Sequence, residues 1–314
     1  MTERCISAVI PVRNQPDTLD LLLGSLIRQV LPEGWVHEVI CVDNASTDHT
    51  PEVIASHTGV IGMREERLGP SIARNTGVAA SKGELIFFID SDANVTSDDF
   101  LAKLIALAEG FGDFAFFGGP IILPPEQISN PVAFADHMAC WSAWSAMRPE
   151  GASDFQPTAC VMQRKWFDKV GGYRTDIRVL EDWDVQMRVS ECRLAESGEK
   201  LPAYFVRSIP VTHSARSSLS RTIKHSWYWG LPSREAWLRP GPDQFIYLET
   251  PVLRWAYLPY LFWARLNAPL RCGWRVSRKR ALLSLPFLAV TVLVWTIAVI
   301  VGKGQPKGDR YAPV

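Results

Sequence analysis

Two carboxylates separated by one residue follow an apolar run in the segment FFIDSDANVT. Asp90 and Asp92 come directly after residues 84–89, which are predicted to form a buried strand. If the backbone stays extended, both side chains lie on the same side, and two neighbouring negative charges are costly unless a cation lies between them. A hard divalent ion that bridges diphosphate oxygens, Mg²⁺ or Mn²⁺, would meet that need. The alternative is a polar turn, because Asp and Ser are common in turns.

A second acidic pair, Glu181 and Asp182, precedes a stretch with helical spacing in VLEDWDVQMR. One interpretation makes Asp182 a general base that deprotonates an acceptor hydroxyl, a task that needs a carboxylate within hydrogen-bond distance. The other is that the pair caps the helix, since negative charge is favoured at a helix N-terminus. Asp184 and Arg188 are four residues apart and are predicted to pair on the helix surface.

Four further polar residues lie next to predicted strands or turns. Asp43 ends the run in VICVDNASTD, where it could accept hydrogen bonds from a base or ribose or could start the turn before the next helix. Arg74 and Asn75, in GPSIARNTG, could bind phosphate or stabilise the aspartates; taken alone, Arg74 is predicted to be a surface residue. His213 follows a short apolar run and is predicted to be either structural or a third metal ligand.

Strand-like and helix-like segments alternate over residues 1–100. The runs at 6–12, 36–42 and 84–89 are predicted strands, whereas 17–30 and a stretch that begins near residue 70 have helical spacing. This alternation predicts an α/β fold with a mostly parallel sheet and helices on both faces. Ligands bind such sheets at the carboxyl ends of the strands, so the polar residues after the strands are expected to form the site. Helical character resumes over 180–193, after a looser region at 114–173.

Composition and charge exclude several classes of protein. A chain of 314 residues, 47% hydrophobic and 21% charged, is typical of one or two folded domains rather than of a disordered protein. The formal net charge is zero, so no overall field recruits nucleic acid. The six cysteines have no C-x-x-C spacing, which predicts reduced thiols. The N-terminus lacks a basic stretch followed by a long apolar region, so no signal peptide is predicted.

The C-terminal part differs from the rest of the chain. Residues 281–301 form an uncharged run close to the roughly 20 residues needed to span a bilayer, with a buried core helix as the alternative. The basic residues before this run outnumber those after it, which predicts a single-pass inner-membrane protein with its large N-terminal part in the cytoplasm. Trp and Arg residues are frequent over 220–274, as suits a membrane interface. The basic residues are Arg271, Arg275, Arg278, Lys279 and Arg280 before the run, and Lys303, Lys307 and Arg310 after it.

Taken in order, the motifs resemble the family-2 glycosyltransferases of the membrane-anchored bacterial type, which have the GT-A fold. The likeness runs through AVIPVRNQPDTLDLLLGSLIRQ, EVICVDNASTDHT, GPSIARNTGVAASKGELIFFIDSDANV and VGGYRTDIRVLEDWDVQMR. The resemblance implies a Rossmann-like, mostly parallel sheet, with residues 1–115 as the nucleotide-sugar-binding half and 116–230 as the acceptor and catalytic half. An amphipathic membrane-interface segment at 231–280, a transmembrane helix at 281–301 and a short tail at 302–314 would follow.

The resemblance also implies roles for individual residues. Asp182 would be the catalytic base, with Glu181 beside it, and Asp43 would read uracil or another base. The implied reaction is metal-dependent, inverting transfer of a single sugar, with a UDP-sugar favoured as donor, to a glycan, lipid-linked or other hydroxyl acceptor at the cytoplasmic membrane face. The residues that would contact the nucleotide sugar are Pro11, Arg13, Asp43, Arg74, Asn75, Asp90 and Ser91. Those that would hold Mg²⁺ or Mn²⁺ are Asp90, Asp92 and His213.

The chain departs from the processive members of that family. Those carry Q-x-x-R-W after the catalytic aspartate, whereas Gln163, Arg164 and Trp166 precede Asp182 here and stand in a different order. This difference favours transfer of a single sugar. Two other interpretations are a membrane-tethered nucleotide-sugar binder without turnover and a haloacid dehalogenase-like phosphatase. The presence of Asp182 argues against the first. The second is disfavoured because D-x-D follows a later strand and has Asn94 at its fifth position.

Overall fold

The computed structural model describes residues 3–177, 180–237 and 255–302, and the chain forms two compact units. Unit 1 consists of Met1–Ile121 and Arg148–His213, and unit 2 of Ile122–Met147 and Ser214–Val314. The predictions for residues 238–254 and 303–314, including Lys303, Lys307 and Arg310, lie outside the described residues.

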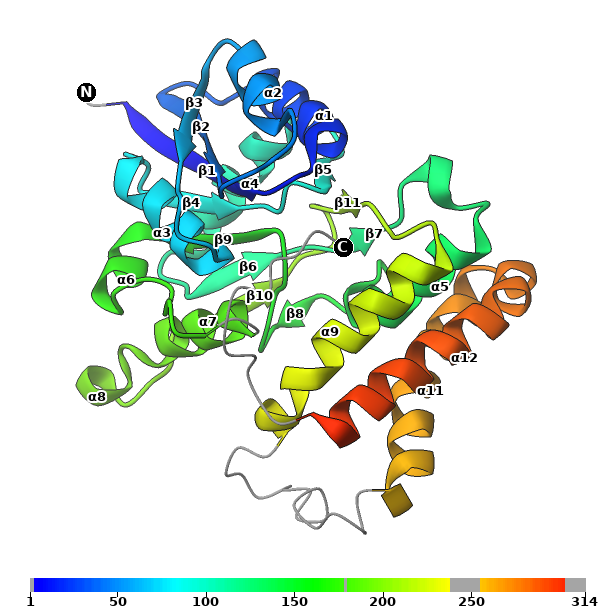
Figure 1. Ribbon diagram of the computed structural model, residues 1–314. Helices are drawn as coiled ribbons and strands as arrows, with labels where there is room; N and C mark the ends of the chain where they lie inside the picture. The colour runs from blue at the N-terminus through cyan, green and yellow to red at the C-terminus, as the bar shows by residue number, and fades with distance from the viewer. Residues whose placement is uncertain (1–2, 178–179, 238–254, 303–314) are drawn as a thin grey trace. The chain divides into compact units, whose positions relative to one another are not determined.

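Unit 1 is built around an eight-stranded sheet with the strand order β3-β2-β1-β4-β9-β6-β10-β8 (Figure 1). In its first half, β1 (Arg4–Val12) lies between β2 (Trp35–Asp43) and β4 (Leu85–Phe88), and β3 (Val60–Arg64) forms the edge. These four strands are parallel. The three predicted strands are confirmed to within two residues at each end.

Beyond β4 the sheet is mixed. β9 (Cys160–Gln163) runs antiparallel to both β4 and β6 (Phe116–Gly118). β10 (Ala203–Phe205) is parallel to β6, and β8 (Gly151–Ala152) pairs with β10 in the antiparallel direction. The looser sequence pattern over 114–173 therefore contains two central strands that are too short to give a clear signal.

The direction of the chain connections reverses at β1. From β1 the chain passes through α1 (Pro16–Ile27) to β2 and through α2 (Thr50–Ser56) to β3; α3 (Pro70–Ala80) then carries it to the other side of β1, where β4 begins. Because such crossovers are right-handed, α1 and α2 cover one face of the sheet and α3 covers the other. The carboxyl ends of β1 and β4 flank this reversal, which is where open α/β sheets bind their ligands.

A small second sheet begins directly after the acidic segment. β5 (Ala93–Val95) pairs antiparallel with β11 (Val211–His213), so that Ala93 lies opposite His213. β7 (Ile121–Ile122) completes this sheet in the order β5-β11-β7. The pairing brings His213 to the acidic segment from a position about 120 residues later in the chain.

Helix α7 (Glu181–Glu191) is fixed to the main sheet by its apolar face. Val185 and Val189 are fully buried in one cluster with Ile86, Phe88 and other sheet residues. Burial of each valine contributes about 1.5–3 kcal/mol, which anchors the turn that carries the acidic pair. The predicted helix over 180–193 is confirmed to within two residues. The remaining helices of this unit are α4 (Phe100–Phe111), α6 (Arg164–Lys169) and α8 (Leu194–Ser197).

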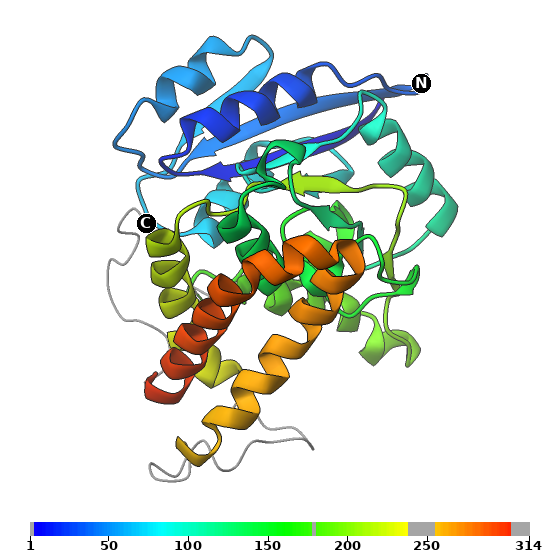
Figure 2. The same cartoon turned by 90° about the vertical axis from the view of Figure 1, so that its right-hand side faces the viewer.

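Unit 2 is helical, and its last helix packs against three others. α12 (Arg278–Val301) contacts α5 (Pro131–Trp141), α9 (Leu219–Trp237) and α11 (Leu258–Val276) (Figures 1 and 2). Its buried side carries Thr291 and Thr296, whose hydroxyls donate to the backbone carbonyls of Phe287 and Val292. Two 3₁₀ helices, η1 (Pro125–Gln127) and η2 (Ser142–Trp144), flank α5 in sequence.

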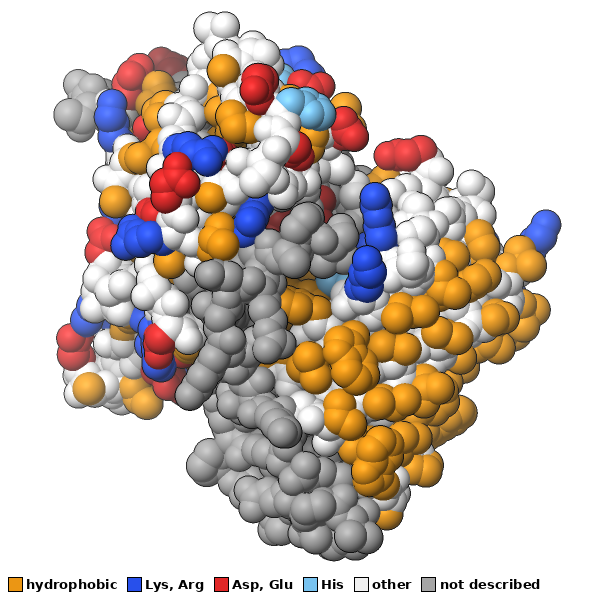
Figure 3. Space-filling model, in the orientation of Figure 1, with side chains coloured by type: hydrophobic (Ala, Val, Ile, Leu, Met, Phe, Trp, Pro, Cys, Tyr) orange, Lys and Arg blue, Asp and Glu red, His pale blue; other side chains and the backbone are white. Residues whose placement is uncertain are grey.

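Among the described residues, α12 is the one helix that is long and apolar enough to cross a membrane. Its most apolar window has a mean hydropathy of 2.4, and 44% of that window is buried. Because the core helix of a soluble protein passes the same test, α12 alone is weak evidence for a span. Figure 3 shows hydrophobic side chains gathered over the unit 2 helices. The exposed ones on α11 and α12 include Tyr260, Trp263, Trp274, Val276, Leu282 and Leu283.

Candidate active site

The segment after β4 turns one side chain inward and two outward. Ser91 is buried and donates its hydroxyl to Gln15 Oε1. The side chains of Asp90 and Asp92 are 28% and 22% exposed. The carbonyl of Asp90 accepts a hydrogen bond from the Ala93 amide at 3.0 Å. The segment is therefore a polar turn, as one interpretation predicted, and the same turn presents two carboxylates.

His213 completes a group of three candidate ligands with these aspartates. Its Nε2 lies 3.2 Å from Asp92 Oδ1, and the residue is 4% exposed. One ligand atom from each of Asp90, Asp92 and His213 lies within 4.8 Å of the other two. Two carboxylate oxygens and an imidazole nitrogen suit a divalent cation. The fold thus brings together the three residues that the sequence predicted as metal ligands.

Arg74 is the centre of a buried charge network. Its guanidinium donates through Nη2 to Asp90 Oδ1 at 2.8 Å and through Nη1 to Glu181 Oε1 at 3.1 Å. Nη1 also lies 3.3 Å from Asp182 Oδ1. The residue is 4% exposed, so the prediction of a surface position is wrong: three carboxylates stabilise the guanidinium in the interior. Arg74 thereby links Asp90 to the acidic pair on α7.

The two acids at the start of α7 have different surroundings. The Glu181 side chain is 6% exposed, and that of Asp182 is 22% exposed. Burial raises the pKa of both carboxyl groups, and the charge of Arg74 opposes the rise. Asp182 is therefore the member of the pair that an acceptor could reach, while Glu181 holds Arg74 from the buried side.

The backbone at the start of α7 is strained. The residue at the N-cap position is Leu180, whose side chain makes no capping hydrogen bond and whose φ is 67°. A left-handed conformation at a non-glycine residue costs on the order of 1 kcal/mol or more. Such strain persists where packing imposes it, as the buried valines of α7 and the ion pairs of Arg74 do here. Asp184 and Arg188 pair as predicted, at 2.9 Å, but Asp184 is buried, so the predicted surface position is wrong for that residue.

Tyr173 belongs to the site, although sequence patterns did not single it out. Its buried hydroxyl donates to Asp182, which opposes the rise in the pKa of that carboxyl. The Arg74 guanidinium lies 5.3 Å from the centre of the Tyr173 ring. The preceding Gly172 has a φ of 72°, and a Cβ there would lie 2.8 Å from Asn75 Oδ1. The Gly-Gly-Tyr sequence before the acidic pair is the signal that could have identified this loop.

The side-chain amide of Asn75 binds the backbone of the same loop. Its Nδ2 donates to the Tyr173 carbonyl at 2.8 Å, and its Oδ1 accepts from the Tyr173 amide at 2.9 Å. These two bonds hold the backbone of Tyr173, whose hydroxyl donates to Asp182. They give the side-chain amide a positioning role in the site.

Pro11, Arg13 and Asp43 lie at or just beyond the carboxyl ends of β1 and β2. Pro11 is paired in register with β2, and Arg13 follows β1 in a half-buried position. Asp43 is 2% exposed; its Oδ1 accepts from the Ser46 amide at 3.0 Å and its Oδ2 from Arg64 Nη1 at 2.6 Å. Asp43 therefore forms the turn that the sequence allowed, and Arg64 is an ionic partner that the sequence did not indicate.

The sequence itself carries a family signature over more than half of its length. A model of glycosyl transferase family 2 matches residues 7–171. The chain belongs to glycosyl transferase family 2. Asp182 and His213 lie beyond the matched stretch, so their place in the site rests on the geometry.

Characterised relatives share parts of this family 2 chain. A poly(ribitol-phosphate) beta-glucosyltransferase of Bacillus spizizenii is 36% identical over 102 residues, which are 31% of this chain and 16% of that protein. A PGL/p-HBAD biosynthesis glycosyltransferase of Mycobacterium bovis is 25% identical over 229 residues, 71% of this chain and 82% of that protein. The chain matches 16–31% of the lengths of three relatives that are 32–36% identical to it.

A solved structure confirms the GT-A fold that the family resemblance implied. The mannosyltransferase PcManGT from Pyrobaculum calidifontis, solved in complex with GDP-Man and Mn²⁺, superposes with a TM-score of 0.57 at 19% sequence identity. The superposition covers 94% of this chain and 85% of that one. At this identity the likeness establishes the fold of the family 2 chain.

Substitution of Asn75 by Ala should destabilise the protein and impair the site. Loss of the amide leaves the buried N–H and C=O of Tyr173 without these partners, which costs about 1–3 kcal/mol. We expect a lower midpoint in urea denaturation and a reduced turnover number. Thr76→Val is the control on the same helix. It removes the hydrogen bond from Thr76 to Glu65 but leaves the Tyr173 loop in place, so it should retain turnover. Equal loss of turnover in both variants would contradict the positioning role.

Proposed function

We propose that this protein transfers a single sugar from a nucleotide-diphosphate donor to an acceptor hydroxyl, with inversion at the anomeric carbon and with the help of a divalent metal. The observation that carries the proposal is the position of Asp182. This carboxylate is partly exposed and is joined through Arg74 to Asp90, one of the three candidate metal ligands. A carboxylate that can act as a base and a candidate metal group thus belong to one connected network, an arrangement that suits metal-assisted displacement.

In this mechanism Asp182 accepts the proton of the acceptor hydroxyl. The acceptor oxygen forms a bond to the anomeric carbon while the bond from that carbon to the diphosphate oxygen breaks. The electron pair of the broken bond leaves with the nucleoside diphosphate. Tyr173 and Arg74 orient Asp182 and favour its charged form, against the effect of burial, which raises its pKa. Glu181 keeps Arg74 in place from the buried side.

The donor set of Asp90, Asp92 and His213 fits Mg²⁺ or Mn²⁺. Hard divalent cations prefer carboxylate oxygens, and Mn²⁺ also accepts an imidazole nitrogen. When bound, such an ion stabilises the negative charge that develops on the departing diphosphate. PcManGT, which shares the fold, was solved with both Mn²⁺ and GDP-Man bound, and this supports the same class of cofactor and donor for the present chain.

For the donor we favour a UDP-sugar that lies across the carboxyl ends of β1, β2 and β4. Pro11, Arg13 and Ser91 surround the reversal of the chain connections, and Asp43 stands at the end of the neighbouring strand. The Arg64 guanidinium and the Ser46 amide hold Asp43 in one orientation. Asp43 is buried and both of its oxygens already accept a bond, so recognition of a base edge would use the second acceptor position that a carboxylate oxygen keeps.

A panel of nucleotide sugars, tested with and without Mn²⁺, provides the direct test. We expect one donor to release its nucleoside diphosphate in a metal-dependent way. Asp92→Asn should weaken Mn²⁺ binding at least tenfold, because it removes a charged ligand. Binding is measured from the electron paramagnetic resonance signal of free Mn²⁺, which is independent of activity. Asp98→Asn, an exposed aspartate close in sequence, is the control. If no nucleotide sugar binds under either condition, the proposal is wrong.

We further propose that unit 2 holds the enzyme at the cytoplasmic face of the inner membrane, where the acceptor is a lipid-linked or other membrane-presented hydroxyl. Exposed aromatic and aliphatic side chains on α11 and α12 adjoin a basic cluster at the turn between these helices. This combination suits insertion among anionic headgroups. The residues of the basic cluster are Arg271, Arg275, Arg278, Lys279 and Arg280.

The packing of α12 favours a position in the membrane interface over a single helix that spans the bilayer. Its buried side contacts three helices of its own unit. If α12 crossed the bilayer, it would either lose those contacts or bring the three helices into the membrane. Alkaline carbonate distinguishes the two arrangements, because it extracts interfacial proteins and leaves spanning ones in the pellet. We expect extraction; retention in the pellet would support the single-pass arrangement that the sequence predicts.

The double substitution Leu282→Asp with Leu283→Asp should detach the protein from membranes. Both side chains are more than half exposed, so the fold loses little. Withdrawal of two leucines from the bilayer costs about 3 kcal/mol or more, which corresponds to at least about a hundredfold weaker binding. Co-sedimentation with anionic vesicles measures the change. Leu21→Asp alters a similarly exposed leucine in unit 1 and should leave vesicle binding intact; a loss in both variants would argue against the assigned face.

A further inference from the structure

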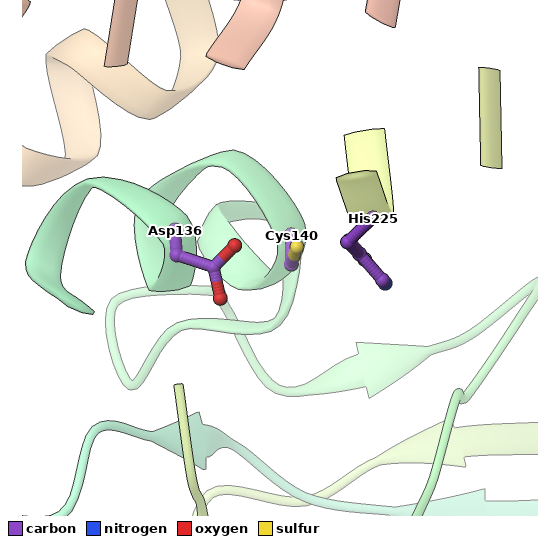
Figure 4. A group of neighbouring side chains, drawn as sticks. All are labelled: Asp136, Cys140 and His225. Carbon is purple, nitrogen blue, oxygen red and sulfur yellow. The ribbon is translucent and has the colours of Figure 1, made fainter. Parts of the chain in front are cut away.

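Helices α5 and α9 of unit 2 bring together three side chains of the kinds that bind transition metals. Asp136 and Cys140 are four residues apart on α5 and therefore lie on one face of that helix. His225 projects from α9 beside them (Figure 4). One ligand atom from each of the three residues lies within 4.8 Å of the other two. All three belong to unit 2, so this cluster is separate from the aspartates of unit 1.

Asp136 has one carboxylate oxygen satisfied and one buried without a partner. The residue is 2% exposed, and its Oδ2 accepts from the Arg216 amide at 3.0 Å and from Arg216 Nη1 at 3.2 Å. Oδ1 is buried and finds no hydrogen-bond partner among the described residues. A buried acceptor without a partner destabilises the folded protein, and a charged one does so more strongly. Arg216 therefore satisfies Oδ2 of Asp136. Oδ1 needs a cation or a hydrogen-bond donor that the described part of the chain does not supply.

Cys140 supplies a soft ligand next to that oxygen. Burial, with a contribution from the charge of Asp136, raises the pKa of its thiol to about 12. The guanidinium groups of Arg216 and Arg265 act in the opposite direction and favour the thiolate. A metal that binds the sulfur replaces the thiol proton and releases it to solvent, as metal–thiolate formation requires.

We propose that Asp136, Cys140 and His225 form a second metal site that takes a borderline-soft divalent cation of the Zn²⁺ class. The metal would bind one carboxylate oxygen, one thiolate sulfur and one imidazole nitrogen, with water or an external ligand in the fourth position. Sulfur and nitrogen donors favour Zn²⁺ over Mg²⁺, whereas the group of Asp90, Asp92 and His213 has no sulfur. The site would tie α5 to α9 within unit 2.

Cobalt(II) is a suitable probe, because a thiolate ligand gives Co²⁺ a sulfur-to-metal charge-transfer absorption that oxygen and nitrogen ligands do not give. We would titrate the full-length protein that carries Asp92→Asn, so that the unit 1 group is weakened as a competitor. We expect one equivalent of Co²⁺ to produce the sulfur band, Zn²⁺ to abolish it by displacement, and Mg²⁺ to leave it unchanged.

Three variants in the same background assign the ligands. Cys140→Ser should abolish the sulfur band and weaken Zn²⁺ binding by more than the 10–100-fold typical of a lost outer-shell partner. His225→Gln changes a half-buried residue on a different helix, and it should weaken Zn²⁺ binding even if Cys140→Ser folds poorly. Cys272→Ser is the control, because Cys272 is a second free cysteine of unit 2; this variant should keep the band and the affinity.

The proposal is overturned if Co²⁺ gives no sulfur band with the Asp92→Asn protein. It is overturned equally if Cys140→Ser keeps the band, or if His225→Gln binds Zn²⁺ as tightly as the Asp92→Asn protein does. None of these outcomes bears on sugar transfer, because neither Asp136, Cys140 nor His225 belongs to the unit 1 site.

Discussion

Asp182→Asn is expected to lower the turnover number by about 10²–10⁴-fold, the usual contribution of a general base. The amide has the size of the carboxylate but cannot accept the proton of the acceptor hydroxyl. Donor binding should persist, because Asp43, Asp90 and Asp92 are unchanged. Turnover is measured as acceptor-dependent release of nucleoside diphosphate, and donor affinity by calorimetry on the same preparations.

Two comparisons make this result specific. Asp176→Asn alters an exposed aspartate in the loop before α7, where it pairs with Arg174, and it should retain normal turnover. Glu181→Gln removes the negative charge that faces Arg74 but keeps a side-chain oxygen that can accept from the guanidinium. Because burial already disfavours the ionised form of Glu181, this variant should lose less turnover than Asp182→Asn. If Asp182→Asn turned over at the normal rate, another group would have to be the base.

Arg74→Met is expected to have the largest effect on stability. The substitution leaves Asp90, Glu181 and Asp182 close together without their shared cation. Removal of one partner from a buried ion-pair network typically costs about 3–5 kcal/mol. Urea denaturation of the wild type and the variant at several pH values measures the loss.

The pH dependence of this loss has a definite sign. Without Arg74 the pKa of Asp182 rises further, since the charge of Arg74 is what opposes the effect of burial. A carboxyl group whose native pKa lies above its unfolded value favours folding while it is protonated, and this contribution is lost as the pH rises through the native pKa. The stability difference between the two proteins should therefore be greatest near neutral pH and should shrink below pH of about 4, where unfolded carboxyl groups are also protonated. The acid limb of the pH–rate profile should move to higher pH.

Arg4→Met is a matched control for that experiment. Arg4 also contacts two carboxylates, Glu84 and Glu109, but its side chain is 49% exposed. Exposed ion pairs contribute about 0–1 kcal/mol, so Arg4→Met should change stability little at any pH. A similar loss of stability in both variants would show that burial of Arg74 does not increase its contribution to stability.

The strand ends and their carboxylates were predictable because the information is local. The runs that became β1, β2 and β4 alternate with helical spacing, and chain direction then places Asp43 and Asp90 at one edge of the sheet. The acidic pair was visible for the same reason, since it precedes a helix whose apolar spacing is clear.

The features that were missed depend on contacts between distant segments. Arg74 was named from the sequence as a residue that could stabilise the aspartates, but nothing near it in sequence indicates a buried position or three carboxylate partners, of which two come more than 100 residues later. β9 has four residues and enters the sheet antiparallel between β4 and β6, which no local pattern could specify. Tyr173 acquires its role through Asn75 and Asp182, both of which reach it by tertiary packing.

The pairing of β11 with β5 sets the order in which the candidate ligand group can be assembled during biosynthesis. His213 is synthesised about 120 residues after Asp92, an interval of roughly 6–24 s at 5–20 residues per second. The entropy of closing so long a loop is offset only when the intervening strands β6, β9 and β10 have joined the main sheet. A nascent chain that has not reached β11 carries both aspartates without the imidazole. Assembly of the group is thus coupled to completion of unit 1, so that a partly made chain cannot present it.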